Sequence, residues 1–140
     1  MSTLLVVALA SAGLAWWVNG DPARYESNRV ATLDTLDDSV EAIGGPPTDW
    51  AIIHVDWVAD NEYFVEQASK RFPDADVRSI TIGEYQTLGG VLREGFASDE
   101  LQTVLVISRL PLDARILPQI PADQPRRTVD PNAVLIGVGA

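Results

Sequence analysis

Residues 3–18 (TLLVVALASAGLAWWV) form an uncharged, apolar segment, and this segment constrains the architecture of the whole chain. A sixteen-residue helix spans about 24 Å, against roughly 30 Å for the hydrocarbon core of a bilayer. Trp16 and Trp17 lie where an aromatic belt would meet the membrane interface. The segment therefore predicts a single transmembrane anchor within residues 1–20, with the lipid bilayer as a partner.

Small residues line one side of this predicted helix. Ala8, Ala12 and Ala15 recur at spacings of four and three, and Ser11 lies beside them. Such a stripe lets a second membrane helix approach closely. Insertion of this segment is favourable by only about 2–4 kcal/mol, so packing on a partner helix is expected. The alternative is a cleaved signal peptide, because Ala8-x-Ala10 resembles a cleavage site, but no positive side chain precedes the segment.

Charge and composition exclude several classes of function. The chain has 20 acidic and 10 basic residues, a net charge of -10 and no cysteine. Only Lys70-Arg71 and Arg126-Arg127 are adjacent basic pairs, so nucleic acid is not an expected partner. An acidic, aspartate-rich surface suits a halophilic or marine source. Arg24 and Arg29 follow the anchor, which favours the cytoplasmic or interior side for the domain.

Residues 21–47 are expected to form a juxtamembrane amphipathic helix and a Gly/Pro linker. Apolar residues recur at helical spacing from about Asn28 to Ile43, and Gly44 stands where a helix-ending glycine belongs. Ser27 or Asn28 can cap the start. The stripe fits either a coiled-coil partner helix or a helix packed on its own domain. We favour the second interpretation, a helix packed on its own domain, because the apolar stripe is too short to hold a coiled coil together.

Residues 48–140 predict a small α/β domain with the order β-α-β-α-β-loop-β. The apolar runs at 51–55 and 103–107 are typical of strands buried on both faces, and the alternating segment 76–82 is typical of an edge strand. A fourth strand is expected at 133–138, and helices are expected from Asp60 or Asn61 to Arg71 and from Glu84 to Phe96. Gly89-Gly90 in the second helix indicates close packing. The prediction is a four-stranded, mostly parallel sheet in the order 2-1-3-4.

Residues 109–131 form the longest predicted connection. Five prolines favour stiff, extended backbone there. Because long loops in compact domains are often functional, this Pro-rich loop is the candidate surface for binding other membrane or assembly proteins. The residues assigned to this contact are Pro111, Pro118, Pro121, Pro125, Arg126 and Arg127.

Polar residues at the predicted strand ends form a weak candidate ligand site. Asp56 and Asp60 follow the first strand, and Ser108 and Arg109 close the third. Parallel sheets bind ligands at this edge, where two aspartates could chelate a cation and an arginine could hold an anion. The competing interpretation is that the aspartates cap a helix and Arg109 pairs with one of them. His54, the only histidine, lies mid-strand, where a core histidine is the usual finding.

No phosphate loop, nucleophile elbow or metal-ligand spacing occurs in the sequence. The expected function is therefore that of a non-enzymatic, single-pass membrane-anchored structural or accessory subunit, without catalytic residues, cofactor or metal. Its assembly would be a membrane-containing virion or a membrane complex. The alternative is a module that binds a small anion or nucleotide at the carboxyl edge of the sheet.

Overall fold

Five strands form one mixed sheet in the computed structural model, which describes residues 22–56, 62–81, 87–109, 111–112 and 116–140. The predicted anchor lies outside these ranges. Within them, no helix is both long enough and apolar enough to cross a membrane. The described elements, in chain order, are α2 (Pro22–Ala42), β1 (Trp50–Asp56), α3 (Glu62–Arg71), β2 (Asp76–Thr81), α4 (Leu88–Ala97), β3 (Thr103–Ser108), the 3-10 helix η1 (Leu117–Gln119), β4 (Arg126–Asp130) and β5 (Ala133–Gly137).

The strand order is β2-β1-β3-β5-β4. The three strands β2, β1 and β3 are mutually parallel, with Ile52 of β1 aligned to Val77 on one side and to Leu105 on the other. Strand β5 lies beside β3 as predicted for the fourth strand, but it runs antiparallel to β3. The α/β class and the order of the first four strands are thus as predicted.

The prediction of four strands was wrong, because β4 pairs antiparallel with β5 at the far edge. Its residues, Arg126–Asp130, had been assigned to the loop 109–131, which also contains η1. The sequence RRTVD has neither an apolar run nor a clear alternation. It becomes a strand because the two-residue connection Pro131-Asn132 folds it back onto the apolar strand β5.

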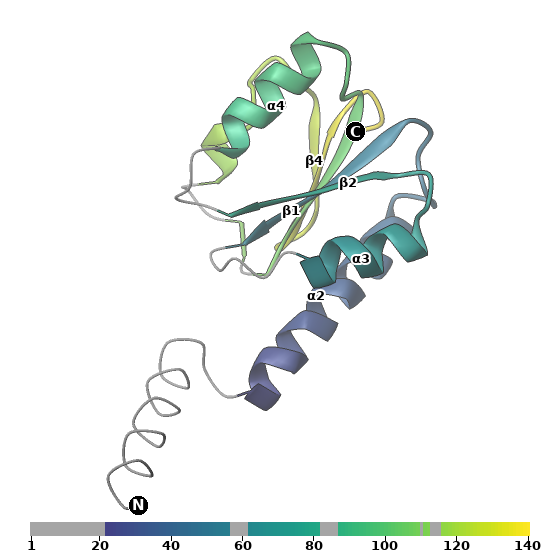
Figure 1. Cartoon of the computed structure of the whole chain (residues 1–140). Coiled ribbons are helices and arrows are strands. Elements are labelled where there is room, and N and C mark those ends of the chain that lie inside the picture. Colours follow the sequence, from purple (N-terminus) through teal and green to yellow (C-terminus); the bar gives the residue numbers. More distant parts are fainter. Residues whose placement is uncertain (1–21, 57–61, 82–86, 110, 113–115) are drawn as a thin grey trace, which may run out of the picture.

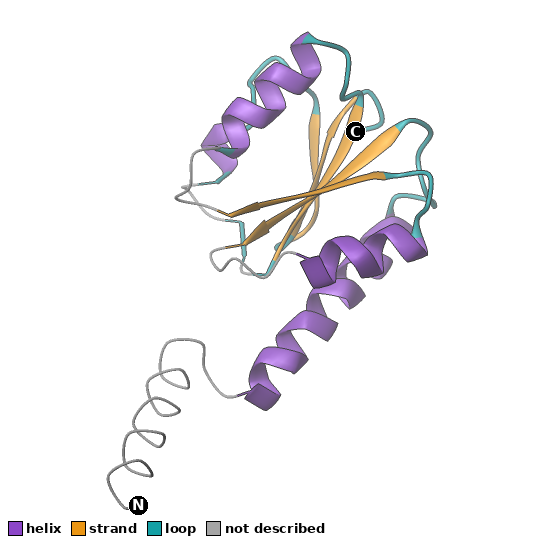
Figure 2. Ribbon diagram, in the orientation of Figure 1, coloured by secondary structure: helices purple, strands orange, loops and turns teal. Residues whose placement is uncertain are grey.

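Helices cover both faces of the sheet, with α2 and α3 on one face and α4 on the other (Figure 2). On the α2/α3 face, the core combines Leu36 and Phe64 with Ile52, Leu105 and Leu135 from the strands. On the α4 face, the core combines Leu88 and Leu92 with Ile53, Val106 and Ile136 from the strands. Strands β1 and β3 are buried on both faces, since each contributes alternate residues to the two cores.

Helix α2 begins at Pro22, upstream of the predicted caps at Ser27 and Asn28. Its second half packs on the sheet through Leu33, Leu36 and Val40, which confirms the prediction that it lies on its own domain. Figure 1 shows its first turns extending past the sheet. The helix ends at a glycine as predicted: Gly44 has φ +94°, and the amides of Gly44 and Gly45 donate to the carbonyls of Glu41 and Val40.

The Pro-rich loop packs on its own domain. Ile116 and Ile120 are buried in the core of the α4 face. The Gln119 carbonyl oxygen would lie 3.0 Å from a Cβ added to Gly89, and the Gly89 amide donates to the Gln119 side chain at 3.2 Å. Helix α4 and this loop therefore pack closely at Gly89, as predicted from the pair Gly89-Gly90.

Candidate functional site

Buried and half-buried polar side chains gather toward the carboxyl ends of β1, β2 and β3, on the face covered by α3. His54 and Asp56 come from β1, Ser79 comes from β2, and Arg109 follows β3 directly. The strand register causes this grouping, because His54 is aligned with Ser79 on one side and with Ile107 on the other. The order of the parallel strands reverses between β1 and β3, where ligands bind in many open α/β sheets.

The His54 ring is held from three directions. Its Nδ1 lies 3.1 Å from the Ser79 hydroxyl, and its Nε2 lies 4.0 Å from Asp56. One ring face stacks on Phe64, with centroids 4.2 Å apart and planes 17° apart. The Ser79 hydroxyl also lies 3.4 Å from the His54 backbone carbonyl, to which it donates, so Ser79 contacts both the ring and the main chain of His54.

Burial lowers the pKa of His54 from 6.5 to about 4, since only 3% of the residue is exposed. The Asp56 carboxylate opposes this shift, and the Arg109 guanidinium adds to it. His54 is therefore neutral at pH 7.

Arg109 forms an internal ion pair with Asp56. Its Nε lies 3.4 Å from Asp56 Oδ1, and the two side chains are 23% and 9% exposed. This contact is an ion pair and not a hydrogen bond, since Arg109 Nε is buried with no hydrogen-bond partner among the described residues. This ion pair is the contact that the competing interpretation of the sequence expected, in which Arg109 pairs with an aspartate. An arginine already paired with a carboxylate attracts a further anion weakly, which disfavours anion binding here.

Ser79, His54 and Asp56 follow one another as in a serine–histidine–acid arrangement, but their properties are poor for nucleophilic catalysis. A general base works best with a pKa near the operating pH, and the pKa of His54 is about 4. The 4.0 Å gap to Asp56 is too long for the hydrogen bond that orients a catalytic histidine. The group forms a largely buried polar network that joins β1 to β2, with Phe64 of α3 stacked on its histidine.

Asn132 connects the same edge to the β4–β5 turn. Its side-chain amide donates to the Ser108 and Arg109 carbonyls, both at 3.1 Å, and its backbone amide donates to Asp130 at 2.9 Å. The Ser108 amide donates to the Asn132 carbonyl at 2.9 Å. These bonds fix the backbone from which Arg109 projects. The sequence analysis did not identify Asn132 or Ser79, although the turn residues Pro131-Asn132 after a charged segment were a signal for a hairpin.

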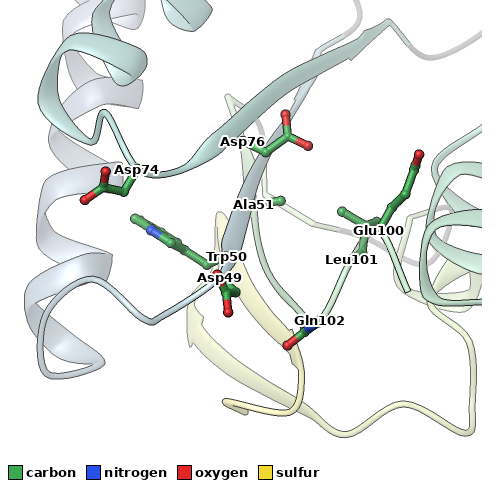
Figure 3. Close-up of a pocket in the computed structure, with 8 residues that line it drawn as sticks. All are labelled: Asp49, Trp50, Ala51, Asp74, Asp76, Glu100, Leu101 and Gln102. Carbon is green, nitrogen blue, oxygen red and sulfur yellow. The ribbon is translucent and has the colours of Figure 1, made fainter. Parts of the chain in front are cut away.

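An acidic cleft of about 430 Å³ lies at the opposite edge of the sheet, where β1, β2 and β3 begin. Figure 3 shows the carboxylates of Asp49, Asp74, Asp76 and Glu100 around it. Asp76 and Glu100 lie 2.7 and 3.8 Å from Arg78. No group of three or more metal-ligating side chains occurs in the part of the chain that the structure describes.

The other predicted residues are placed as follows. Asp60 and the anchor residues Ala8, Ser11, Ala12, Ala15, Trp16 and Trp17 lie outside the described residues. Pro118 belongs to η1, Pro111 and Pro125 are exposed, and Arg126 and Arg127 begin β4 with exposed side chains. Pro121 is half-buried and accepts a turn hydrogen bond from Gln124.

Comparison of the chain with models of protein families, with characterised proteins and with solved structures finds no match.

Proposed function

We propose that this protein is a non-enzymatic, single-pass membrane-anchored subunit with a structural or accessory role in a larger membrane-associated assembly, such as a virion membrane or a membrane complex. The observation that carries the proposal is the uncharged apolar segment at residues 3–18, followed after three residues by α2. Its lack of charge and its paired tryptophans are typical of a segment held at a bilayer, and its modest length favours packing on a partner helix.

The arrangement of α2 supports the same role. The helix has 21 residues, and its buried apolar side chains among the described ones begin at Leu33. At 1.5 Å per residue, the portion from Pro22 to Leu33 extends about 16 Å. A helix of this kind would hold the sheet away from the headgroups while keeping it attached to them.

The polar network at His54 supports the non-enzymatic part of the proposal. Its histidine is a weak base, its arginine is paired, and its residues are mostly buried. Stability and precise strand alignment are sufficient reasons for such a network.

Membrane retention of the full-length chain tests the anchor. Val6→Arg places a charge in the middle of the apolar segment and should release the chain from membranes washed with alkaline carbonate. Val6→Leu is the matched control and should be retained like the unmodified chain. If Val6→Arg is retained equally well, the anchor is refuted.

Recovery of the native assembly tests the role in assembly. Ala12→Leu adds bulk to the small-residue stripe and should reduce co-purification of the chain with its complex several-fold. Ala10→Leu is the matched control, because at about 100° per residue Ala10 lies on the opposite side of the helix from Ala8 and Ala12. Equal recovery of both variants would contradict packing through the stripe.

A further inference from the structure

The described basic side chains fall into two groups. Those of the first group form ion pairs with carboxylates and belong to Lys70, Arg71, Arg78 and Arg109. Arg126 and Arg127, the first two residues of β4, are exposed and form no ion pair with any described residue. Arg93 of α4 is a third such cation, and its Nε donates to the Gly89 carbonyl at 3.2 Å. In a chain with a net charge of -10, the adjacent pair on β4 forms a surface that attracts acidic groups.

Arg126 and Arg127 are called the arginine edge below, because β4 is an outermost strand of the sheet. Nη1 of Arg126 donates to the Leu117 carbonyl at 3.2 Å, which holds this guanidinium against η1. The backbone of β4 is poorly suited to pairing with another strand, since its register with β5 is irregular between Thr128 and Asp130. A partner would therefore contact β4 through its charged side chains.

Helix α2 carries a complementary set of carboxylates. Asp34, Asp38 and Glu41 recur at spacings of four and three, and all three are exposed. At about 100° per residue they fall within about 60° of one another, on the side of the helix opposite the one that packs on the sheet. None of them forms an ion pair with a described residue, whereas the neighbouring Asp37 is paired with Arg71. These three carboxylates are called the acidic stripe.

The arginine edge and the end of the acidic stripe lie at the same end of the sheet. Strand β4 is antiparallel to β5, which is antiparallel to β3, so β4 begins at the end where β1 and β3 begin. Helix α2 leads into β1, and Val40 shares the α2/α3 core with Trp50, the first residue of β1. No ion pair joins the arginine edge to the acidic stripe within the described chain. Copies anchored in one membrane share their orientation, so a rotation about the membrane normal can place one surface beside the other.

We propose that the arginine edge of one copy of this chain binds the acidic stripe of a second copy, so that anchored copies associate head to tail. A contact of this kind joins two different surfaces, and it closes into a ring or continues as an array. Two such chains repel each other on average, but this contact brings together only opposite charges, and anchoring in one membrane raises the effective concentration of the copies. The inference rests on the proposed function, since it names the second copy as a partner within the assembly.

The test uses disulfide cross-linking, because the chain has no cysteine of its own and two introduced cysteines report a single contact. Thr128→Cys lies beside the arginine edge and Ala42→Cys lies beside the acidic stripe, both at exposed positions. The two full-length variants are mixed in phosphatidylcholine liposomes and oxidised mildly. The mixed dimer should exceed each variant's dimer with itself by more than random pairing gives. Ala97→Cys, at an exposed position of α4, is the control partner and should cross-link with either variant only at the random level.

Removal of charge shows whether the arginines cause the contact. Arg126→Gln and Arg127→Gln, made together in the Thr128→Cys chain, should lower the yield of the mixed dimer about threefold or more, since two surface ion pairs are lost. Arg93→Gln with Lys70→Gln is the matched control, because it removes the same charge at exposed positions elsewhere, and it should leave the yield unchanged. Equal loss with both pairs of substitutions would show a general charge effect and refute the proposal.

An exchange of charge completes the test. Asp38→Lys with Glu41→Lys in the Ala42→Cys chain should abolish the mixed dimer, and reversing the arginine edge to glutamate in the other chain should restore it. Failure of the exchange to restore the dimer, a yield no higher than with the control partner, or predominance of either variant's dimer with itself would each overturn the proposal. Retention in carbonate-washed membranes does not depend on these charges. A chain that is retained but does not cross-link therefore refutes this contact alone, whereas a chain that is not retained refutes the anchor.

Discussion

Removing the only histidine should change how the stability of this protein depends on pH. The pKa of His54 is about 4 in the folded chain, lowered mainly by burial, and 6.5 is its ordinary value. Between these values the unfolded chain binds more protons, so stability rises with pH. The contribution is complete above pH 6.5 and is lost as the pH falls toward 4. From pH 7 to pH 5 the loss amounts to about 2 kcal/mol.

Chemical denaturation of the full-length chain in neutral detergent measures this effect. The unmodified chain should lose about 2 kcal/mol of unfolding free energy between pH 7 and pH 5, and His54→Gln should lose little, because the chain has no other histidine. Ser79→Ala is the matched control: it removes a polar partner but keeps the buried ring, so most of the loss should remain. If His54→Gln shows the same loss as the unmodified chain, the ring is not held neutral by burial.

Three further perturbations follow from the packing. Gly95→Ala should destabilise the fold by about 1–3 kcal/mol in denaturation, because the added Cβ would lie 2.3 Å from Leu101 Cδ1; no change would mean that α4 can move away. Ile120→Ala should lose about 2–5 kcal/mol, since Ile120 is buried in the core, and a loss below about 1 kcal/mol would contradict packing of the Pro-rich loop on its own domain. A double-mutant cycle of Arg109→Met and Asp56→Asn should give a coupling of about 1–3 kcal/mol, and additive effects would refute the ion pair.

The central strands could be predicted because burial on both faces leaves a clear signal in sequence. Residues 51–55 and 103–107 are nearly all apolar, and β1 and β3 indeed lie between other strands. The alternation in 76–82 predicted an edge, and β2 is one. Strand β4 could not be found in this way, because an exposed edge strand buries little of its own surface. Its pairing partner β5, and not its own sequence pattern, makes it a strand.

The residues of the candidate site also differ in whether the sequence could predict them. Asp56, Ser108 and Arg109 were identified because they stand at the ends of apolar runs, and those positions meet at one edge of a parallel sheet. The contact of Ser79 with His54 depends on the register between β1 and β2, which no local pattern specifies. Asn132 depends on a hairpin whose first strand was not recognised.

The position of β5 bears on how the chain is made. This strand follows every other described strand in sequence, yet it lies between β3 and β4. During synthesis, β3 therefore emerges with one apolar edge that only a later segment can cover. Until Ala133–Gly137 leave the ribosome, Val104, Leu105 and Val106 border an unpaired edge of the kind on which nascent chains aggregate. A chaperone held on β3 until β5 has paired with it would protect this edge during that interval.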